Sequence, residues 1–170
     1  TTGPRRSGAA RIWATRSGLM VLPVKSGGSL VSKCRTLAAV ITPATRLVWL
    51  EAAGSVTLEF PDLRALVRTV RERAPQAVVA LDNTWGAGLA FDAFDLGQGQ
   101  GVDVTIHALT KYPSGGGDVL MGSVVCRDDA LYRKLALSRS RVGHGVGVND
   151  VEAVLRSLPS LPLRYAAQDQ

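Results

Sequence analysis

The sequence predicts an α/β fold in which strands separated by helices or long loops build a sheet that is covered on both faces. Four short apolar runs are spaced along the chain with helical patterns or loops between them. One of these runs, AVVAL at 77–81, is apolar without alternation, which is typical of a strand buried on both faces. The 170 residues fit the size of a single domain.

The first elements are expected between residues 46 and 75. The run RLVWL at 46–50 predicts a buried strand, and 54–61 predicts a loop that ends at proline. Asp62 is the expected N-cap of a helix whose apolar positions fall on one face: Leu63, Leu66, Val67 and Val70. Pro75 ends this helix, since proline has no backbone N–H to donate.

Three further strands and two helices are expected downstream. The second strand covers 77–81 and ends at Asp82. The third covers 102–109, with alternate apolar residues on one face, and the fourth covers 119–126. Two aspartates are expected to cap the helices that follow, Asp128 a helix through Arg141 and Asp150 a helix through Ser157.

The composition is that of a globular protein and excludes several classes. Hydrophobic residues make up 46% and charged residues 20% of the chain, which argues against disorder. No apolar run reaches the roughly 18 residues of a membrane-spanning helix. The 2 cysteines form neither a disulfide framework nor a CxxC motif, so a reducing, cytoplasmic location is expected. The 2 histidines leave little material for a metal site, and none is predicted.

Positive charge is concentrated at the beginning of the chain. Residues 1–50 hold eight basic residues and no acidic one, whereas 51–170 hold the other 12 basic and all 14 acidic residues. This first part is rich in Arg, Ser, Thr and Gly and predicts little regular structure. We therefore expect residues 1–40 to be a basic segment without a recognisable fold, and 41–170 to be part of an α/β domain.

Three explanations of the basic segment are open. It could be a transit peptide, because such peptides are rich in Arg and Ser and poor in acids. It could be a nucleic-acid-binding arm, but its single aromatic residue, Trp13, gives almost no aromatic interleaving. It could also be translated from the wrong reading frame. The lack of an initiating methionine and of any acid favours this third explanation, and no nucleic-acid or membrane partner is expected.

Common functional motifs fail on inspection. The glycines of 97–101 are followed by Val102 and precede a strand, so they do not form a dinucleotide-binding fingerprint and predict a turn. The run at 114–118 lacks the GK[ST] of a phosphate loop. No GxSxG motif is present. His107 lies among apolar neighbours and is expected to be a hydrogen-bonded core or subunit-contact histidine, while His144 lies in a glycine-rich loop without a sequence partner.

Two charged residues at strand ends are the best candidates for a site. Asp82 follows the run AVVAL, and Lys111 follows VDVTIHALT. Ligands of open α/β sheets bind outside the carboxyl ends of strands, so a carboxylate and an amine there could face one ligand. Solvated loop residues are the alternative. The neighbours favour a site: Asn83-Thr84-Trp85 is polar and aromatic, and Thr110 and the glycines of 115–117 would let a ligand approach closely.

Three stretches carry a resemblance to a known family. They are LVWLEAAGSVTLEFPDL at 47–63, VVALDNTW at 78–85 and VDVTIHALTKYPSGGGDVLMG at 102–122, and weaker similarity extends over 142–168. Together they resemble the Cys/Met-metabolism pyridoxal 5'-phosphate (PLP) enzymes, and among these the cystathionine β-lyases most. The resemblance implies part of the large PLP-binding domain of the aspartate-aminotransferase-like fold, known as fold type I.

The resemblance also assigns roles to three residues. Lys111 matches the lysine that bonds covalently to PLP and acts as the catalytic base. Asp82 matches the aspartate that pairs with the pyridine nitrogen, and a carboxylate there keeps the ring protonated as an electron sink. Thr110 matches the hydroxyl that helps to hold the cofactor phosphate. Ala108, where some members have serine, is more like the bacterial β-lyases.

The implied reaction is β-elimination in trans-sulfuration and methionine biosynthesis. Cystathionine would be cleaved to homocysteine, pyruvate and ammonia. A related γ-synthase or γ-lyase, and an inactive fragment or pseudo-enzyme, stay open as alternatives. Complete members are more than twice as long and tetrameric, and the substrate-carboxylate arginine, the ring-stacking tyrosine and the glycine-rich phosphate turn are not found here. We therefore expect a partial chain that holds the chemical centre without most of the substrate site.

Overall fold

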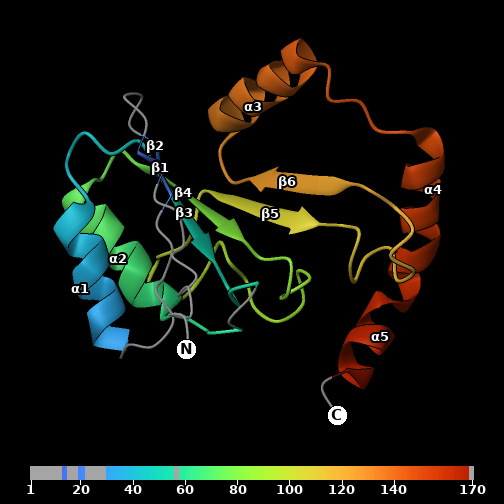
Figure 1. The fold of residues 1–170 in the computed structure, drawn as a ribbon, viewed down its shortest axis with the longest axis horizontal. Helices are drawn as coiled ribbons and strands as arrows, with labels where there is room; N and C mark the ends of the chain where they lie inside the picture. Colours follow the sequence, from blue (N-terminus) through green and yellow to red (C-terminus); the bar gives the residue numbers. More distant parts are fainter. Residues whose placement is uncertain (1–12, 15–18, 22–29, 56–57, 169–170) are drawn as a thin grey trace, which may run out of the picture.

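The strands form one mixed sheet (Figure 1). The computed structural model describes residues 13–14, 19–21, 30–55 and 58–168. Within these ranges the strand order in space is the order in sequence, β1 to β6. Strands β2 to β5 run parallel, and the two edge strands pair antiparallel with their neighbours. The strands are β1 Trp13–Ala14, β2 Leu19–Val21, β3 Leu47–Glu51, β4 Val78–Asp82, β5 Val104–Ala108 and β6 Gly122–Cys126.

Two groups of helices accompany the sheet. Helices α1 Leu30–Val40 and α2 Leu63–Arg73 pack against each other at one side of it. The C-terminal part of the chain forms α3 Asp129–Val142, α4 Val148–Ser157, the short 3-10 turn Leu158–Ser160 and α5 Leu161–Ala167. Figure 1 shows α4 and α5 beyond the carboxyl ends of the parallel strands. The α/β prediction is therefore confirmed, and the four strands expected from the sequence are β3 to β6.

The core lies between β3, β4 and the helices α1 and α2. All four apolar positions predicted for α2 are buried, and they pack with Val48, Leu50, Val79 and Leu81 of the two strands. Burying one such side chain completely stabilises the fold by about 1.5–3 kcal/mol. Ala80, on the opposite face of β4, is also buried. The expectation that 77–81 is covered on both faces thus holds for β4.

Helix caps show where local signals predicted the structure and where they did not. The Asp62 carboxylate accepts a hydrogen bond from the Ala65 N–H at 3.0 Å, and α2 ends before Pro75, as predicted. Asp128 caps α3 in the same way. The prediction for Asp150 is wrong, because α4 begins at Val148 after Gly147. Asp150 lies in the first turn instead, where its charge faces the positive end of the helix dipole.

The expectation of little regular structure near the beginning of the chain does not hold for α1. Leu37 and Ile41, four residues apart, are buried in the core cluster, which fixes this helix on α2. Residues 1–12, 15–18 and 22–29 lie outside the described part of the chain, so the explanations of the basic segment are not tested here. The division of the chain at residue 41 stays a prediction.

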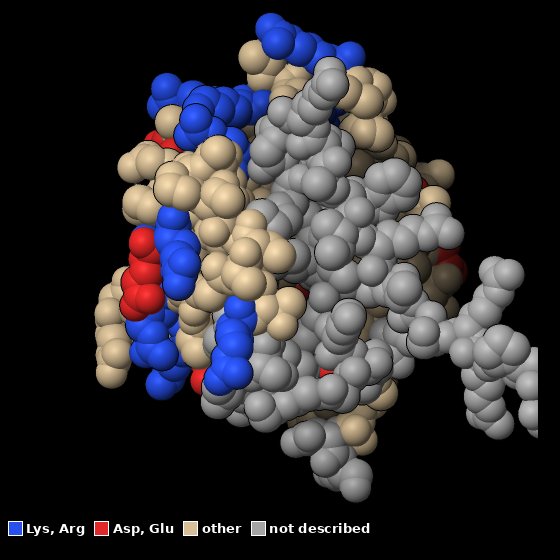
Figure 2. All heavy atoms as spheres, turned by 60° about the vertical axis from the view of Figure 1, so that its left-hand side comes forward, with Lys and Arg blue, Asp and Glu red and all other residues tan. Residues whose placement is uncertain are grey.

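Basic side chains gather on the side of the molecule that carries α1 and α2. Figure 2 shows this side, where blue Lys and Arg outnumber red Asp and Glu. Helix α2 places four arginines, Arg64, Arg68, Arg71 and Arg73, away from its buried stripe. Within the described ranges, no helix is long and apolar enough to cross a membrane, and no group of three or more His, Cys, Asp or Glu could hold a metal ion.

Candidate active site

The register of β4 and β5 brings two predicted site segments to one edge of the sheet. The two strands run parallel with Asp82 opposite Ile106. The loops that follow β4 and β5 therefore leave the sheet at neighbouring points. Asp82 is the last residue of β4, and Lys111 follows the end of β5 by three residues. The carboxylate and the amine therefore emerge at the same end of adjacent parallel strands, which is where α/β sheets bind ligands.

Asp82 is held by a hydrogen-bonded bridge between the two strands. Its Oδ1 accepts hydrogen bonds from the Thr84 hydroxyl at 2.6 Å and from the Thr84 N–H at 3.0 Å. The same hydroxyl accepts a hydrogen bond from the Ala108 N–H at 2.9 Å. Thr84 is only 5% exposed, so the bridge is shielded from water. No hydrogen bond to Asp82 Oδ2 is found within the described part of the chain.

Lys111 and Thr110 line a pocket of about 540 Å³. The Lys111 ammonium lies 5.2 Å from the centre of the Trp85 ring, which is within the range of a cation–π interaction. In the described part of the chain the Thr110 hydroxyl makes no hydrogen bond. Asp82 is not among the residues that line this pocket, which are Trp85, Thr110, Lys111, Tyr112, Gly115, Gly116, Gly117, Arg164 and Gln168.

Helix α5 contributes two residues that sequence analysis missed: Arg164 lines the pocket, and Tyr165 contacts the loop after β4. The Arg164 guanidinium donates a 2.6 Å hydrogen bond to the Tyr112 carbonyl, next to Lys111. The Tyr165 hydroxyl donates to the Trp85 carbonyl at 3.1 Å, and its ring packs edge-on against Tyr112 at 5.1 Å. These contacts tie the loops after β4 and β5 to α5. Both residues lie in the stretch 142–168, so its weaker family resemblance is a signal that could have pointed to them.

Gly115 allows this close contact between the lysine loop and α5. Its φ of +75° is in the left-handed region that favours glycine. A Cβ atom there would lie 2.9 Å from the Ser157 Oγ and 3.0 Å from the Arg164 Cζ. A side chain at this position would strain the backbone and would displace the Ser157 hydroxyl and the Arg164 guanidinium. The glycine run at 115–117 thus permits an approach of α5, in addition to the approach of a ligand that the sequence suggested.

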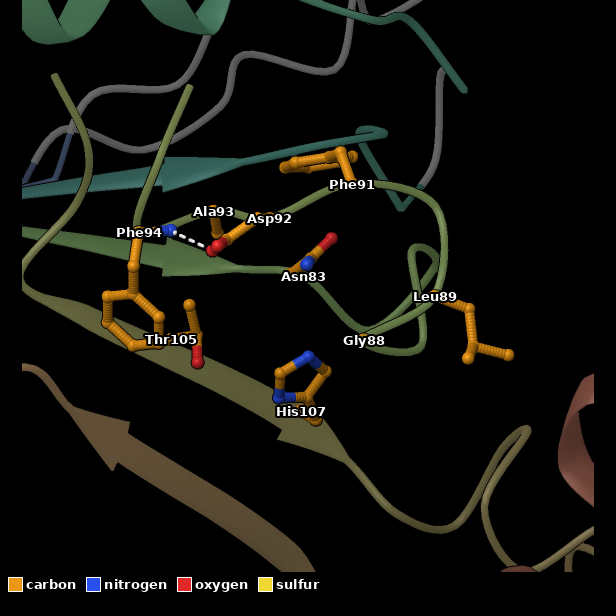
Figure 3. A pocket seen from close by; sticks show the side chains of 9 residues that line it. All are labelled: Asn83, Gly88, Leu89, Phe91, Asp92, Ala93, Phe94, Thr105 and His107. Atoms are coloured by element: carbon orange, nitrogen blue, oxygen red, sulfur yellow. Dashed lines mark hydrogen bonds between the residues drawn. The ribbon is translucent and has the colours of Figure 1, made fainter. Parts of the chain in front are cut away.

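His107 and Asn83 line a separate pocket of about 330 Å³ (Figure 3). The prediction of a hydrogen-bonded His107 is not confirmed: its Nε2 is buried and has no hydrogen-bond partner among the described residues, and the same is true of the Asn83 Oδ1. Burial lowers the pKa of His107, and the Asp82 carboxylate acts weakly in the opposite direction. Asn83 lines this pocket, whereas Asp82, the preceding residue, does not.

Three polar side-chain atoms at this edge of the sheet make no hydrogen bond among the described residues, and they fit PLP chemically. An amine can bond to its aldehyde, a carboxylate can pair with its ring nitrogen, and a hydroxyl can donate to its phosphate. Lys111, Asp82 Oδ2 and Thr110 supply one group of each kind. The residues present thus match the cofactor that the resemblance implies.

Comparisons with known proteins agree with this arrangement. The chain is 35% identical over 130 residues to a cystathionine β-lyase of Bordetella avium, covering 76% of this chain and 31% of the relative. It is 36% identical over 124 residues to the cystathionine β-lyase MetC of Escherichia coli (strain K12), covering 73% and 30%. A crystal structure of cystathionine γ-lyase from Lactobacillus plantarum complexed with L-serine aligns with a TM-score of 0.66 and 25% identity, over 76% of this chain and 32% of that one.

The extent of these matches defines what the chain contains. It spans about a third of the length of the curated relatives, and the α/β fold is a part of the fold type I domain of PLP-dependent lyases. The model of the Cys/Met metabolism PLP-dependent enzymes matches residues 14–170, so the similarity begins upstream of residue 41, where sequence analysis first recognised it. On this evidence the chain belongs to the family of Cys/Met metabolism PLP-dependent enzymes.

Proposed function

We propose that this chain carries the chemical centre of a PLP-dependent carbon–sulfur lyase that cleaves cystathionine by β-elimination. The observation that carries the proposal is the strand-end arrangement: Lys111 and Thr110 line one pocket, and the Thr84 bridge holds Asp82 at the same edge of the sheet. Two similar relatives named cystathionine β-lyase favour β-elimination and this sulfur amino acid as the substrate.

Each residue has a role that its position supports. Lys111 Nζ would hold the cofactor through its aldehyde, and as a free amine it would take the proton from the substrate Cα. Asp82 Oδ2 accepts the hydrogen bond of the ring nitrogen and keeps that nitrogen protonated. Thr110 Oγ1 donates to the phosphate. When bound, PLP supplies the electron sink for the negative charge that develops at Cα. Breaking the Cβ–S bond would release homocysteine, and addition of water to the remaining three-carbon unit would give pyruvate and ammonia.

A γ-eliminating or γ-replacing activity is the second candidate. The alignment with a structure named cystathionine γ-lyase favours it, and the family resemblance implies the same lysine, aspartate and threonine for both reaction types. The alternative to any activity is a non-catalytic chain, since the match covers only about a third of the relatives. We also propose a cytoplasmic location and a homo-oligomer, with the tetramer of the family as the expected form.

Titration with PLP tests the proposal directly. The intact chain should develop the absorbance band of a lysine–PLP bond, and borohydride should fix PLP to Lys111. Lys111→Ala should abolish both signals. Lys134→Ala is the matched control, because Lys134 is exposed on α3, and it should leave them unchanged. A chain that gives no band at saturating PLP, or a band that survives Lys111→Ala, would refute the assignment. Pyruvate release from cystathionine then separates β-elimination from γ-elimination, which gives an oxobutyrate.

A further inference from the structure

We infer that Thr84 is a positioning residue that aims the carboxylate of Asp82 at the PLP ring nitrogen and sets its distance from the Lys111 loop. The inference rests on the proposed function, and it adds a residue to which the family resemblance gave no role. The Thr84 hydroxyl contacts the Asp82 carboxylate and the Ala108 N–H of β5, so its effect on the cofactor passes through these two contacts.

The hydrogen bonds of Thr84 place one oxygen of Asp82 and leave the other available. Both the hydroxyl and the N–H of Thr84 donate to Oδ1, at 2.6 Å and 3.0 Å. Two donors on one oxygen fix the rotation of the carboxylate about its Cβ–Cγ bond. Oδ2, which has no partner within the described ranges, is then the oxygen presented to a ligand. A correctly aimed acceptor is what a ring N–H needs for a short, charge-assisted hydrogen bond.

The same hydroxyl also couples Asp82 to the lysine loop. It accepts the Ala108 N–H at 2.9 Å, and Ala108 precedes Thr110 by two residues and Lys111 by three. A hydroxyl has one donor and two acceptor sites, so these two bonds can form together. Thr84 is 5% exposed, and water therefore does not replace the bridge readily when the side chain is changed. One side chain thus controls both ends of the gap that the cofactor would span.

The test removes the Thr84 hydroxyl and retains the shape of the side chain. Thr84→Val keeps the branched side chain and deletes both hydroxyl bonds, whereas Thr84→Ser keeps the hydroxyl. Thr69→Val is the matched control, because among the described residues the Thr69 hydroxyl bonds only to the Ala65 carbonyl within α2. Two properties are measured: hydrogen exchange of the Ala108 amide in the cofactor-free chain, and PLP affinity with the position of the absorbance band.

Thr84→Val should speed exchange at Ala108 about tenfold and weaken PLP binding about tenfold, as expected for the loss of one hydrogen bond to a charged group. The absorbance band should also shift, because the ring nitrogen loses a well-aimed partner. Thr84→Ser should stay within about twofold of the wild type, and Thr69→Val should change neither property. If Thr84→Val does not fold, Thr84→Ala provides the same comparison.

Two results would overturn the inference. One is an Ala108 amide that exchanges equally fast in the wild type and in Thr84→Val, since the bridge would then be absent. The other is unchanged PLP affinity and an unchanged band in Thr84→Val when exchange at Ala108 has increased, because the bridge would then have no part in placing Asp82. A wild-type chain without any PLP band but with a protected Ala108 amide refutes the proposed function instead, so the two failures are distinguishable.

Discussion

Arg164 offers a direct test of whether α5 organises the lysine loop. Its guanidinium makes four hydrogen bonds, of which three stay within the C-terminal segment, to Ser157 and Ser160. The fourth reaches the Tyr112 carbonyl, 52 residues away in sequence, at 2.6 Å. Arg164→Met keeps most of the aliphatic packing and deletes all four bonds, so the variant isolates the polar attachment of α5 to the loop.

The size of the effect follows from the bond that crosses to the loop. A hydrogen bond that involves a charged group contributes about 1.5–3 kcal/mol. Arg164 is partly exposed, which places the value near the lower end, about 1.5 kcal/mol, or roughly a tenfold change in equilibrium. Water can reach the freed Tyr112 carbonyl at the pocket, so no additional penalty for a buried, unpaired group is expected.

Hydrogen exchange at Gly115 measures this change without any cofactor. The Gly115 N–H donates to the Lys111 carbonyl at 3.0 Å, so it reports on the closed loop. Arg164→Met should expose this amide about tenfold more often. Arg156→Met is the control, because Arg156 forms only an exposed ion pair with Glu152, and such pairs contribute about 0–1 kcal/mol. Equal exchange in the two variants would refute the view that α5 holds the loop.

Two further predictions concern stability. Burial lowers the pKa of His107, so the unfolded chain binds its proton more readily, and stability should fall as the pH drops below about 6.5. His107→Gln should remove the pH dependence of the urea midpoint between about pH 7.5 and 5.5, whereas His144→Gln, at an exposed position, should leave it unchanged. A urea midpoint that still falls with pH in His107→Gln contradicts this reasoning. Arg71 binds Asp103 at 2.8 Å and two carbonyls, so Arg71→Met should cost about 2–3 kcal/mol in chemical denaturation. A loss no larger than that of the exposed Arg68→Met, about 0.5 kcal/mol, would show that this network is not stabilising.

Elements with local signals could be predicted from the sequence. Helix α2 carries an N-cap aspartate, a regular apolar stripe and a terminating proline, and all three lie within 14 residues of one another. Strand β4 is an unbroken apolar run, and the structure moves its expected bounds by one residue. Helix α1 was missed because its stability comes from packing on α2. Leu37 of this helix and Ile41 just after it are buried, but they give little pattern in a segment rich in Arg and Ser.

The site residues fall into the same two groups, those with a local sequence signal and those without one. Asp82, Thr110 and Lys111 follow apolar runs, so their place at strand ends could be read from the chain. Thr84 acts through Ala108, 24 residues away, and Arg164 through Tyr112, so only the folded chain brings these partners together. For His107, the neighbouring residues in the sequence gave the wrong expectation about hydrogen bonding. Apolar neighbours indicated a satisfied core residue, but the side chain faces a pocket where its Nε2 meets no described donor or acceptor.

Polar contacts at both ends of the β4–β5 pair favour the register in which Asp82, rather than Asn83, would face the proposed cofactor. At the amino end, the Asp103 carboxylate binds Arg71 at 2.8 Å and the Val79 N–H at 2.7 Å. At the carboxyl end, Thr84 binds Asp82 and Ala108. A slip of one residue would turn every side chain of β4 to the other face, placing an amide where a charge is needed. Apolar packing alone resists such a slip weakly here, because β4 is apolar on both faces. The polar contacts therefore favour the observed register, and through it the side chain that would meet the ring nitrogen under the proposed function.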